Sequence, residues 1–351
     1  MADEAARVSV VIVGAGPAGM SAAMTLSGRM DTIVIERLDD ARFGRYHSIC
    51  GEAVSDRSFK RLGWMPSAIV RRVDAIGISS SGGRSIAIPV KGSIVDRPSM
   101  LAEMRSRCDA RFVRGSVRSV ERTDDGFRLT LCDGRTFECG WLLGADGAHS
   151  TVRRDVFHAD ATDRLPIVNC IAEGDADPVL GFTVAGRYSG GYSWLFPSKP
   201  GTVSVGFPKG CGDPAKVEGL REHGARDLPF GVLDTVADGN CALIGDAACL
   251  ANPLCYGGIG AALLSGRFAA EAILKGDLGI YGRWVAGDRM FDHRFMDAHR
   301  TFCSWTDDEI EDAMMPFEKG YSVLRGLYAI LRRPGFSNLY MAIFIALRIG
   351  W

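Results

Sequence analysis

Two apolar runs near the start of the chain enclose a glycine-rich turn and a predicted helix. Val8 to Val13 is almost continuously apolar, which is typical of a parallel strand that is buried on both faces. The pattern then predicts a helix from about Pro17 to Gly28 and a second strand from Thr32 to Ile35. Pro17 suits the first turn of this helix, where its missing N–H is no loss. The order strand, helix, strand predicts the first unit of a Rossmann-type domain.

The turn between the first strand and the helix reads Gly14-Ala15-Gly16-Pro17-Ala18-Gly19. Its glycines allow a sharp turn and a close approach of the backbone to a pyrophosphate, at which the helix aims its N-terminus. Glu36 ends the second strand, about 20 positions after the glycines, where an acid can accept hydrogen bonds from a ribose. This spacing of the glycines and the acid predicts a dinucleotide site that includes Gly14, Gly16, Gly19 and Glu36.

Two later buried strands each lead into an aspartate. Trp141 to Gly144 precedes Asp146, and Cys241 to Ile244 precedes Asp246. Open α/β sheets bind ligands at the carboxyl ends of their strands, so both carboxylates are candidate ligand contacts. For Asp146 a second interpretation stays open, in which the carboxylate caps the helix that follows.

A second glycine-rich helix start, Gly257-Gly258-Ile259-Gly260, follows the last of these strands. Its dipole would stabilise negative charge on a bound group. A nicotinamide enzyme needs only the first unit, whereas a long cofactor with a reactive second end needs the later strands and this helix as well. The combination therefore favours FAD.

The middle of the chain changes character. Aromatic, glycine and β-branched residues dominate 165–210 and predict an antiparallel sheet inserted between two parts of the nucleotide domain. Tyr192, Trp194 and Phe196 share one face by the two-residue period of a strand, and this face either walls an apolar cavity or is ordinary core. Gly82-Gly83 predicts a hairpin within Ser79 to Val90. Two polar segments, 37–46 and 209–226, are expected to be a loop and a poor core element, respectively.

Residues 281–351 are predicted to be helical. Leu339 to Leu347 is a nine-residue apolar run bracketed by Arg332-Arg333 and Arg348, with Trp351 at the end of the chain. The run is too short to span a bilayer. It is either an interfacial helix with basic flanks on phosphate heads, or a buried core helix or dimer contact.

The composition of the chain argues against nucleic-acid binding and against a metal site. With 47% hydrophobic residues, a formal net charge of −1 and a pI of about 6.6, the chain has ample core and no feature that favours nucleic acid. Its ten cysteines are scattered without a C-x-x-C motif, so we expect free thiols and no metal site. Met1 to Arg7 lacks a signal-peptide pattern, which predicts a cytoplasmic protein, with peripheral contact on the inner face of the membrane left open.

The predicted fold class is α/β, or α+β overall. A Rossmann-type FAD-binding domain is expected over residues 1–160 and 230–280, and an antiparallel-sheet substrate domain over 161–229. Residues 70–100 are expected to lie partly in the substrate region, and 281–351 to form a C-terminal helical region.

The order of these motifs resembles the p-hydroxybenzoate-hydroxylase-like flavoproteins and, within them, the geranylgeranyl reductase family, whose members include digeranylgeranylglycerophospholipid reductases. The resemblance covers about residues 8–275. Its most specific signs are Cys50-Gly51-Glu52, the Tyr192-x-Trp194-x-Phe196-Pro197 segment, and Gly245-Asp246 followed by Gly258-Ile259-Gly260. It implies FAD contacts at Ala18, Glu36, Cys50, Gly51, Ala53, Arg97, Val117, Asp246, Gly258 and Ile259.

One departure from the family pattern concerns the substrate end of the flavin. Many relatives read Gly-Glu-Gly-Ile where this chain has Tyr256-Gly257-Gly258-Ile259, so Tyr256 is expected beside the flavin. The implied catalytic residues are Cys50 and Tyr256. The implied substrate contacts are Tyr192, Trp194, Phe196 and Tyr256.

The resemblance implies an FAD-dependent reductase that saturates isoprenoid double bonds, in geranylgeranyl chains on a diphosphate or a membrane glycerophospholipid. Hydride would come from FADH2 and a proton from Cys50, Tyr256, Tyr192 or the flavin itself. The expected partners are an isoprenoid lipid and an external electron donor, which is ferredoxin, an F420-type cofactor or NADPH. A flavin monooxygenase or halogenase of the same fold, and an electron-transfer flavoprotein, remain as alternatives.

Overall fold

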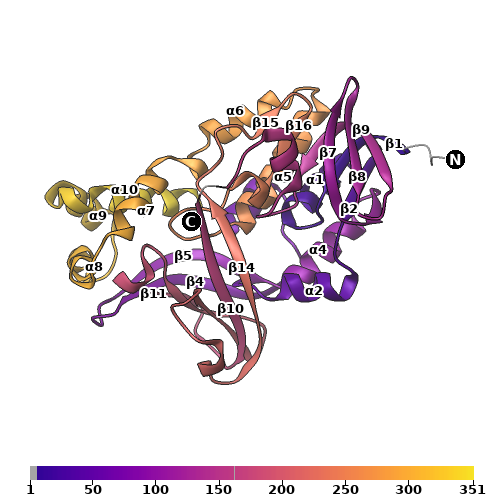
Figure 1. Ribbon diagram of the computed structural model, residues 1–351. Coiled ribbons are helices and arrows are strands. Elements are labelled where there is room, and N and C mark those ends of the chain that lie inside the picture. The colour runs from indigo at the N-terminus through magenta and orange to yellow at the C-terminus, as the bar shows by residue number, and fades with distance from the viewer. Residues whose placement is uncertain (1–5, 162) are drawn as a thin grey trace.

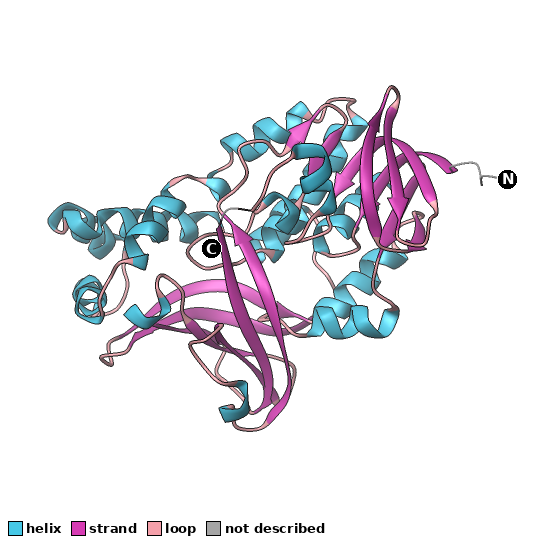
Figure 2. Ribbon diagram, viewed as in Figure 1, coloured by secondary structure: helices cyan, strands magenta, loops and turns pink. Residues whose placement is uncertain are grey.

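The computed structural model describes residues 6–161 and 163–351. Within this part of the chain the strands form two eight-stranded sheets, with helices packed around the first sheet and a separate group of C-terminal helices (Figures 1 and 2). This arrangement confirms the predicted mixed α/β fold class.

The first sheet is built around β1. It contains β1 (Ala6–Val13), β2 (Thr32–Glu36), β6 (Arg111–Arg114), β7 (Val117–Thr123), β8 (Gly126–Leu131), β9 (Thr136–Gly144), β15 (Ala237–Asp238) and β16 (Cys241–Leu243). The order β16-β9-β1-β2-β6 is parallel throughout, and β7, β8 and β15 are attached by antiparallel pairing. The apolar side chains of β1 are buried on both faces, as their continuous run predicts.

Helices α1 (Pro17–Leu26) and α5 (Ile259–Leu274) pack closely against each other on this sheet. A Cβ atom on Gly266 of α5 would lie 2.1 Å from the carbonyl oxygen of Ala18 in α1. The hydroxyl of Ser21 donates to the carbonyl of Leu263 at 2.6 Å across the same interface. Only a glycine at position 266 permits this approach, which joins the first and last parts of the nucleotide domain.

The second sheet runs β14-β10-β13-β12-β11-β4-β5-β3. Its strands are β3 (Ala53–Ser55), β4 (Ile69–Ser80), β5 (Ser85–Val95), β10 (Asp163–Glu173), β11 (Val179–Val184), β12 (Ser193–Pro197), β13 (Thr202–Pro208) and β14 (Leu220–Phe230). The predicted Gly82-Gly83 hairpin is the connection between β4 and β5. Most pairs are antiparallel as predicted, but β11 pairs with β4 in parallel.

One local prediction is wrong. The expected loop at 37–46 contains most of α2 (Asp40–Ser48). Asp39 caps the N-terminus of this helix by accepting the N–H of Arg42 at 2.8 Å. The polar segment at 209–226 contributes to the edge strand β14, and none of its residues is buried, so the prediction of a poor core element is confirmed. The strand predicted from Trp141 begins earlier, at Thr136, as part of β9.

Seven further helices complete the described part of the chain. They are α3 (Asp56–Leu62), α4 (Arg97–Ser106), α6 (Gly279–Gly287), α7 (Arg294–Cys303), α8 (Asp307–Met314), α9 (Val323–Arg332) and α10 (Ser337–Ile349). The apolar run at 339–347 lies in α10, where Tyr340, Ala342 and Ile345 are buried. The other six residues of the run are half-buried, so the helix packs on the core along one side. Across the described residues, every helix is too short or too polar to cross a bilayer.

The close packing of α1 and α5 predicts that even one added methyl group at their contact destabilises the protein. Gly266→Ala should lower the free energy of unfolding by about 2 kcal/mol, because the added methyl must displace backbone rather than a flexible side chain. Gly287→Ala is the matched control, since a Cβ at that position meets nothing within 4 Å. Urea unfolding of both variants measures the difference, and equal stabilities would contradict the packing argument.

Candidate functional site

The glycine turn after β1 is held against the end of β9. Gly14 has a φ of +104°, and a Cβ on it would lie 2.3 Å from the carbonyl oxygen of Ala145. A Cβ on Gly19 would lie 1.9 Å from the carbonyl oxygen of Gly14. The turn therefore depends on both glycines, and it brings the N-terminus of α1 to the carboxyl edge of the sheet, where a phosphate can bind.

Glu36, at the end of β2, lies directly beside this turn. Its carboxylate accepts the N–H of Ala15 at 2.9 Å and the N–H of Leu38 at 2.8 Å. These bonds fix the carboxylate at the edge of the turn, the position that the spacing predicts.

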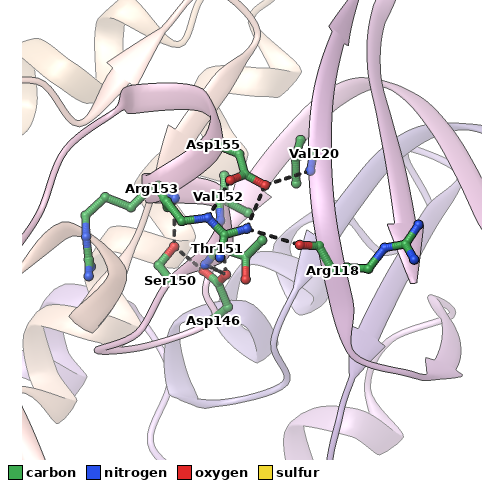
Figure 3. A network of polar contacts seen from close by, with 9 residues as sticks. Arg118, Val120, Asp146, Ser150, Thr151, Val152, Arg153 and Asp155 are labelled. Atoms are coloured by element: carbon green, nitrogen blue, oxygen red, sulfur yellow. Dashed lines mark hydrogen bonds and ion pairs between the residues drawn. The ribbon is translucent and has the colours of Figure 1, made fainter. Parts of the chain in front are cut away.

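Asp146 has a structural role (Figure 3). Its carboxylate accepts from the hydroxyl of Ser150 at 2.5 Å and from the N–H groups of Thr151 and Val152 at 2.7 and 3.2 Å. Arg153 adds to the same turn by donating to the carbonyls of Ala148 and Ala247. The capping interpretation of Asp146 is thus confirmed, since its carboxylate accepts the first N–H groups of the helix that follows.

Asp246 differs from Asp146 in having an unused carboxylate. It lies in a short turn, Gly245–Ala248, immediately after β16, and among the described residues no hydrogen-bond donor contacts its side chain. Burial raises the pKa of this carboxyl, while the charge of Arg97 acts in the opposite direction. A Cβ on Gly258 would lie 3.4 Å from its Oδ1, so the glycine-led start of α5 adjoins the free carboxylate.

The first and last motifs meet at Ala18. A Cβ on Gly245 would lie 2.9 Å from the Cβ of Ala18. The structure therefore brings the predicted contacts Ala18, Asp246 and Gly258 to one place. Val117 is a core residue of β7, in the hydrophobic cluster of the first sheet.

Cys50 and Gly51 form the loop between α2 and β3 and contact the second sheet. A Cβ on Gly51 would lie 3.0 Å from Cδ2 of Phe196 and 3.8 Å from Nε1 of Trp194. Cys50 is partly exposed. Ala53 begins β3 and pairs with Ile94 at the edge of this sheet.

Four aromatic side chains form an aromatic wall: Phe182 of β11, Tyr192 just before β12, and Trp194 and Phe196 of β12. Adjacent rings are in edge contact, with centroids 4.7 Å apart for Phe182 and Tyr192 and 5.1 Å apart for Phe182 and Phe196. Trp194 donates to Ser204 at 3.2 Å, and Gly206 leaves room for its indole, since a Cβ there would lie 1.9 Å from Cζ2. The shared face that the two-residue period predicts is present, and Leu195 on the other face is 49% exposed.

Tyr256 joins the aromatic wall to α7. It has a φ of +49°, and its ring centroid lies 5.6 Å from that of Tyr192. Its hydroxyl donates to the carbonyl of Gly190 at 3.2 Å and lies 3.4 Å from Nδ1 of His299. Burial raises the pKa of Tyr256 and lowers that of His299. Tyr192 likewise donates to a carbonyl, that of Cys255.

Two arginines hold the C-terminal end of α2 between the sheets. Arg97 Nε donates to the carbonyl of His47 at 3.0 Å, and Arg226 Nη2 donates to the carbonyl of Tyr46 at 2.6 Å. His47 is buried with no partner for its Nδ1 among the described residues, and burial, with the charges of both arginines, lowers its pKa to about 2. The imidazole is therefore neutral and has a free polar atom beside Gly16, whose Cβ would lie 3.8 Å from its Cε1.

Glu52 belongs to the Cys50-Gly51-Glu52 motif, but the sequence analysis assigned it no role. Its side chain is 2% exposed, and its Oε1 accepts the N–H of Arg97 at 2.9 Å. Burial raises its pKa to about 7, against the opposing effects of Arg97 and Lys199. It lines a cavity of about 280 Å³ with Ser48, Ile171, Ser198, Lys199, Thr202, Arg221 and Glu222.

The motif marks Glu52, but no local pattern reveals the burial of Glu52 or His299, because that burial comes from contacts with distant elements. In the described part of the chain no cluster of three His, Cys, Asp or Glu side chains could hold a metal ion.

Comparison with known proteins assigns the family. Residues 9–162 match the family model described as lycopene cyclase protein. The chain is 32% identical over 327 residues to the menaquinone reductase of Mycolicibacterium smegmatis, covering 78% of each chain. It is 25% identical over 312 residues to digeranylgeranylglycerophospholipid reductase 1 of Methanosphaera stadtmanae, covering 77% of this chain and 75% of the relative. The chain belongs to the geranylgeranyl reductase family.

Solved structures show the same fold. A geranylgeranyl bacteriochlorophyll reductase-like protein of Thermoplasma acidophilum superposes with a TM-score of 0.79 at 19% identity, over 97% of this chain and 99% of that chain. A flavin-dependent brominase superposes with a TM-score of 0.64 at 18% identity, over 98% and 94%. At these identities the likeness defines the flavoprotein fold, which reductases share with halogenases.

The burial of Glu52 predicts a pH dependence of stability. Its pKa is higher in the folded protein, about 7, than in the unfolded chain, 4.5, so the folded state binds the proton more tightly. This contribution to stability is fully present below pH 4.5, is lost as the pH rises towards 7, and amounts to about 3 kcal/mol. Glu52→Gln, which keeps the acceptor for Arg97, should remove this loss. The free energy of unfolding of the variant minus that of the wild type should therefore be larger at pH 8 than at pH 5. Urea unfolding at the two pH values measures it, and a pH-independent difference contradicts the assignment.

Proposed function

We propose that the protein is an FAD-dependent reductase that saturates double bonds of isoprenoid chains, such as geranylgeranyl chains on a diphosphate or a membrane glycerophospholipid. The observation that carries this proposal is the contact between the Cys50–Gly51 loop and the aromatic wall at Phe196. It places a large apolar surface against the loop that lies between the nucleotide-binding edge and the second sheet.

The residues at the nucleotide-binding edge fit FAD. Asp246 is half-buried and its carboxylate accepts no hydrogen bond among the described residues, and Nδ1 of His47 is buried without a partner there. Both are polar atoms that a bound polar group would satisfy. The residues that would hold FAD are Gly14, Gly16, Ala18, Gly19, Glu36, Cys50, Gly51, Ala53, Arg97, Asp246, Gly258 and Ile259. Reduced FAD supplies the hydride for the reaction.

The chain must supply the proton. An isolated trisubstituted alkene has no electron-withdrawing group, so its reduction requires a positioned acid in a dry pocket. The hydroxyls of Tyr192 and Tyr256 already donate to backbone carbonyls, and burial raises the pKa of both. We therefore assign the proton to the thiol of Cys50, and we give Tyr256 the role of shaping the substrate end of the site.

Glu52 supports this assignment of Cys50. It follows Cys50 by two residues, lines a polar cavity, and has a pKa of about 7, so a substantial fraction of its carboxyl is protonated at neutral pH. We assign to Glu52 the return of a proton to the loop after each turnover. Each double bond gains one hydride and one proton, and an external donor then returns the electrons to the flavin.

The aromatic wall favours an apolar chain as the substrate. Each buried CH2 of a prenyl chain contributes roughly 0.8 kcal/mol to binding by loss of water-exposed area. Menaquinone and digeranylgeranylglycerophospholipid, which the names of the two relatives specify, have different head groups but share a polyprenyl chain. We therefore propose the polyprenyl chain as the substrate class.

Anaerobic single turnover tests this function against a monooxygenase or halogenase of the same fold. The flavin is reduced chemically under argon, and the protein is then mixed with a geranylgeranyl lipid. The reductase reoxidises its flavin without oxygen and yields products heavier by two hydrogens per reduced bond. A flavin that stays reduced until oxygen is admitted, with an oxygenated product, would overturn the proposal.

Glu36→Ala should weaken FAD binding about 10- to 100-fold, because the loss of hydrogen bonds to a ribose removes about 1–3 kcal/mol. Glu121→Ala, at an exposed position of β7, is the control. Titration of the apoproteins with FAD, followed by flavin fluorescence, measures both affinities. Equal affinities of wild type and Glu36→Ala for FAD would contradict the proposed hydrogen bonds between Glu36 and the ribose.

Cys50→Ser should lower the rate of double-bond reduction about 100-fold, since a hydroxyl is a far weaker acid than a thiol. The variant should retain its bound, yellow flavin. Cys132→Ser, which changes an exposed cysteine, should leave the rate unchanged. Single-turnover rates under argon measure the effect. Full activity in Cys50→Ser would reduce this residue to a packing role.

A further inference from the structure

Helix α9 presents an apolar face that no other element of the described chain covers. Leu324, Leu327, Tyr328 and Leu331 repeat at helical spacing and are exposed, and Leu324 and Leu331 reach 79% and 81%. Val323 extends this surface, and the five residues are called the α9 face below. The opposite side of the helix, with Gly326 and Ala329, is buried. A face of large exposed side chains at this spacing marks an interaction site.

The segment that carries the α9 face has charge of one sign. Residues 319–351 contain Lys319, Arg325, Arg332, Arg333 and Arg348 and no acidic residue, in a chain whose net charge is −1. Arg332 and Arg348 are exposed, and each lies over an aromatic ring, Arg332 over Tyr328 and Arg348 over Phe344. Of the acids that precede this segment, Glu311 and Glu318 pair with Arg84, while Asp312 is exposed and accepts from Arg333 only through its backbone carbonyl. The basic segment itself is therefore complementary to an anionic partner.

The α9 face belongs to the same end of the molecule as the aromatic wall. One hydrophobic cluster contains Trp194 and Phe196 of the wall, Trp305 and Phe317 of the C-terminal region, and Ala329 on the inner side of α9. In Figure 1, α9 lies at the far left of the molecule, and β1 of the nucleotide-binding sheet lies at the right. A partner on the α9 face would therefore approach from the side of the substrate wall.

We propose that the α9 face docks the protein on the surface of an anionic lipid bilayer. An amphipathic helix with leucines on one face and arginines beside it lies in the plane of a bilayer interface, with its apolar side chains among the acyl chains and its basic groups on phosphates. This inference deepens the proposed function and rests on it, because a polyprenyl lipid resides in a bilayer. It also moves the membrane contact from α10, whose apolar side chains are largely packed inside, to α9.

A second copy of the chain is a poorer occupant of the face. In a two-fold symmetric contact the same patch meets itself, so the arginines of residues 319–351 would approach their own copies, and this segment contains no acid to pair with them. An anionic bilayer instead offers phosphate to each of these arginines and hydrocarbon to each leucine.

Vesicle flotation of the holoprotein tests the proposal. The probes are vesicles of phosphatidylcholine and vesicles of an equal mixture of phosphatidylcholine and phosphatidylglycerol. Wild type should float with the mixed vesicles and should bind more weakly as salt is added. Leu324→Glu combined with Leu331→Glu should bind at least tenfold more weakly. Met65→Glu is the matched control, because Met65 is 45% exposed in a loop outside the α9 face.

Three outcomes would overturn the proposal. They are failure of the wild type to bind the mixed vesicles, equal binding by the double variant, and a wild-type dimer that the double variant converts to a monomer. The last outcome would assign the face to a second copy. Retention of the yellow flavin by the double variant shows that it is folded.

Turnover of a short, water-soluble prenyl diphosphate separates this inference from the proposed function. A double variant that reduces this substrate but no longer floats supports both. A wild type that floats but reduces no prenyl compound refutes the reductase and leaves the docking surface standing.

Discussion

The close approach of α5 to α1 is the constraint on which the candidate site depends. Ala18 of α1 is contacted by Gly266 of α5 and by Gly245 at the end of β16, at distances that exclude a side chain at either glycine. Segments more than two hundred residues apart in sequence are thereby held together. The phosphate-binding turn, the free carboxylate of Asp246 and the glycine-led start of α5 then share one edge of the sheet, as a cofactor with two functional ends requires.

The second constraint is the junction between the two sheets. The end of α2 is held by Arg97 from one side and by Arg226 of β14 from the other, through the carbonyls of His47 and Tyr46. These two hydrogen bonds position the Cys50–Gly51 loop, in which Gly51 leaves room for the ring of Phe196. The proposed cofactor site and the aromatic wall are consequently adjacent, although different sheets carry them.

How far the sequence predicts these features depends on whether they are local. The glycine turn, the position of Glu36 and the shared face of Trp194 and Phe196 follow from spacing alone, because strand and turn geometry determine them. Asp146 and Asp246 look alike in sequence, since each ends a buried strand. Only the following residues distinguish them, because Ser150 and two backbone N–H groups satisfy Asp146 and no donor satisfies Asp246. The burial of Glu52 depends on distant elements, so no local pattern reveals its raised pKa.

The C-terminal region shows the same limit. The continuous apolar run at 339–347 is the candidate membrane contact in the sequence. In the structure, α10 packs much of that run inside, and the exposed leucines lie on α9. The helix α2 was missed for a related reason, because its polar sequence has no apolar stripe and its position is fixed by arginines from elsewhere in the chain.

Hydrogen–deuterium exchange of the apoprotein with and without FAD tests most directly whether these segments form one cofactor site. The account predicts that FAD slows exchange simultaneously in three segments, Gly14–Gly19, Cys50–Glu52 and Gly257–Gly260. Slower exchange in Gly14–Gly19 alone would mean that the protein binds only the adenosine end of a nucleotide, and it would contradict the single distributed FAD site.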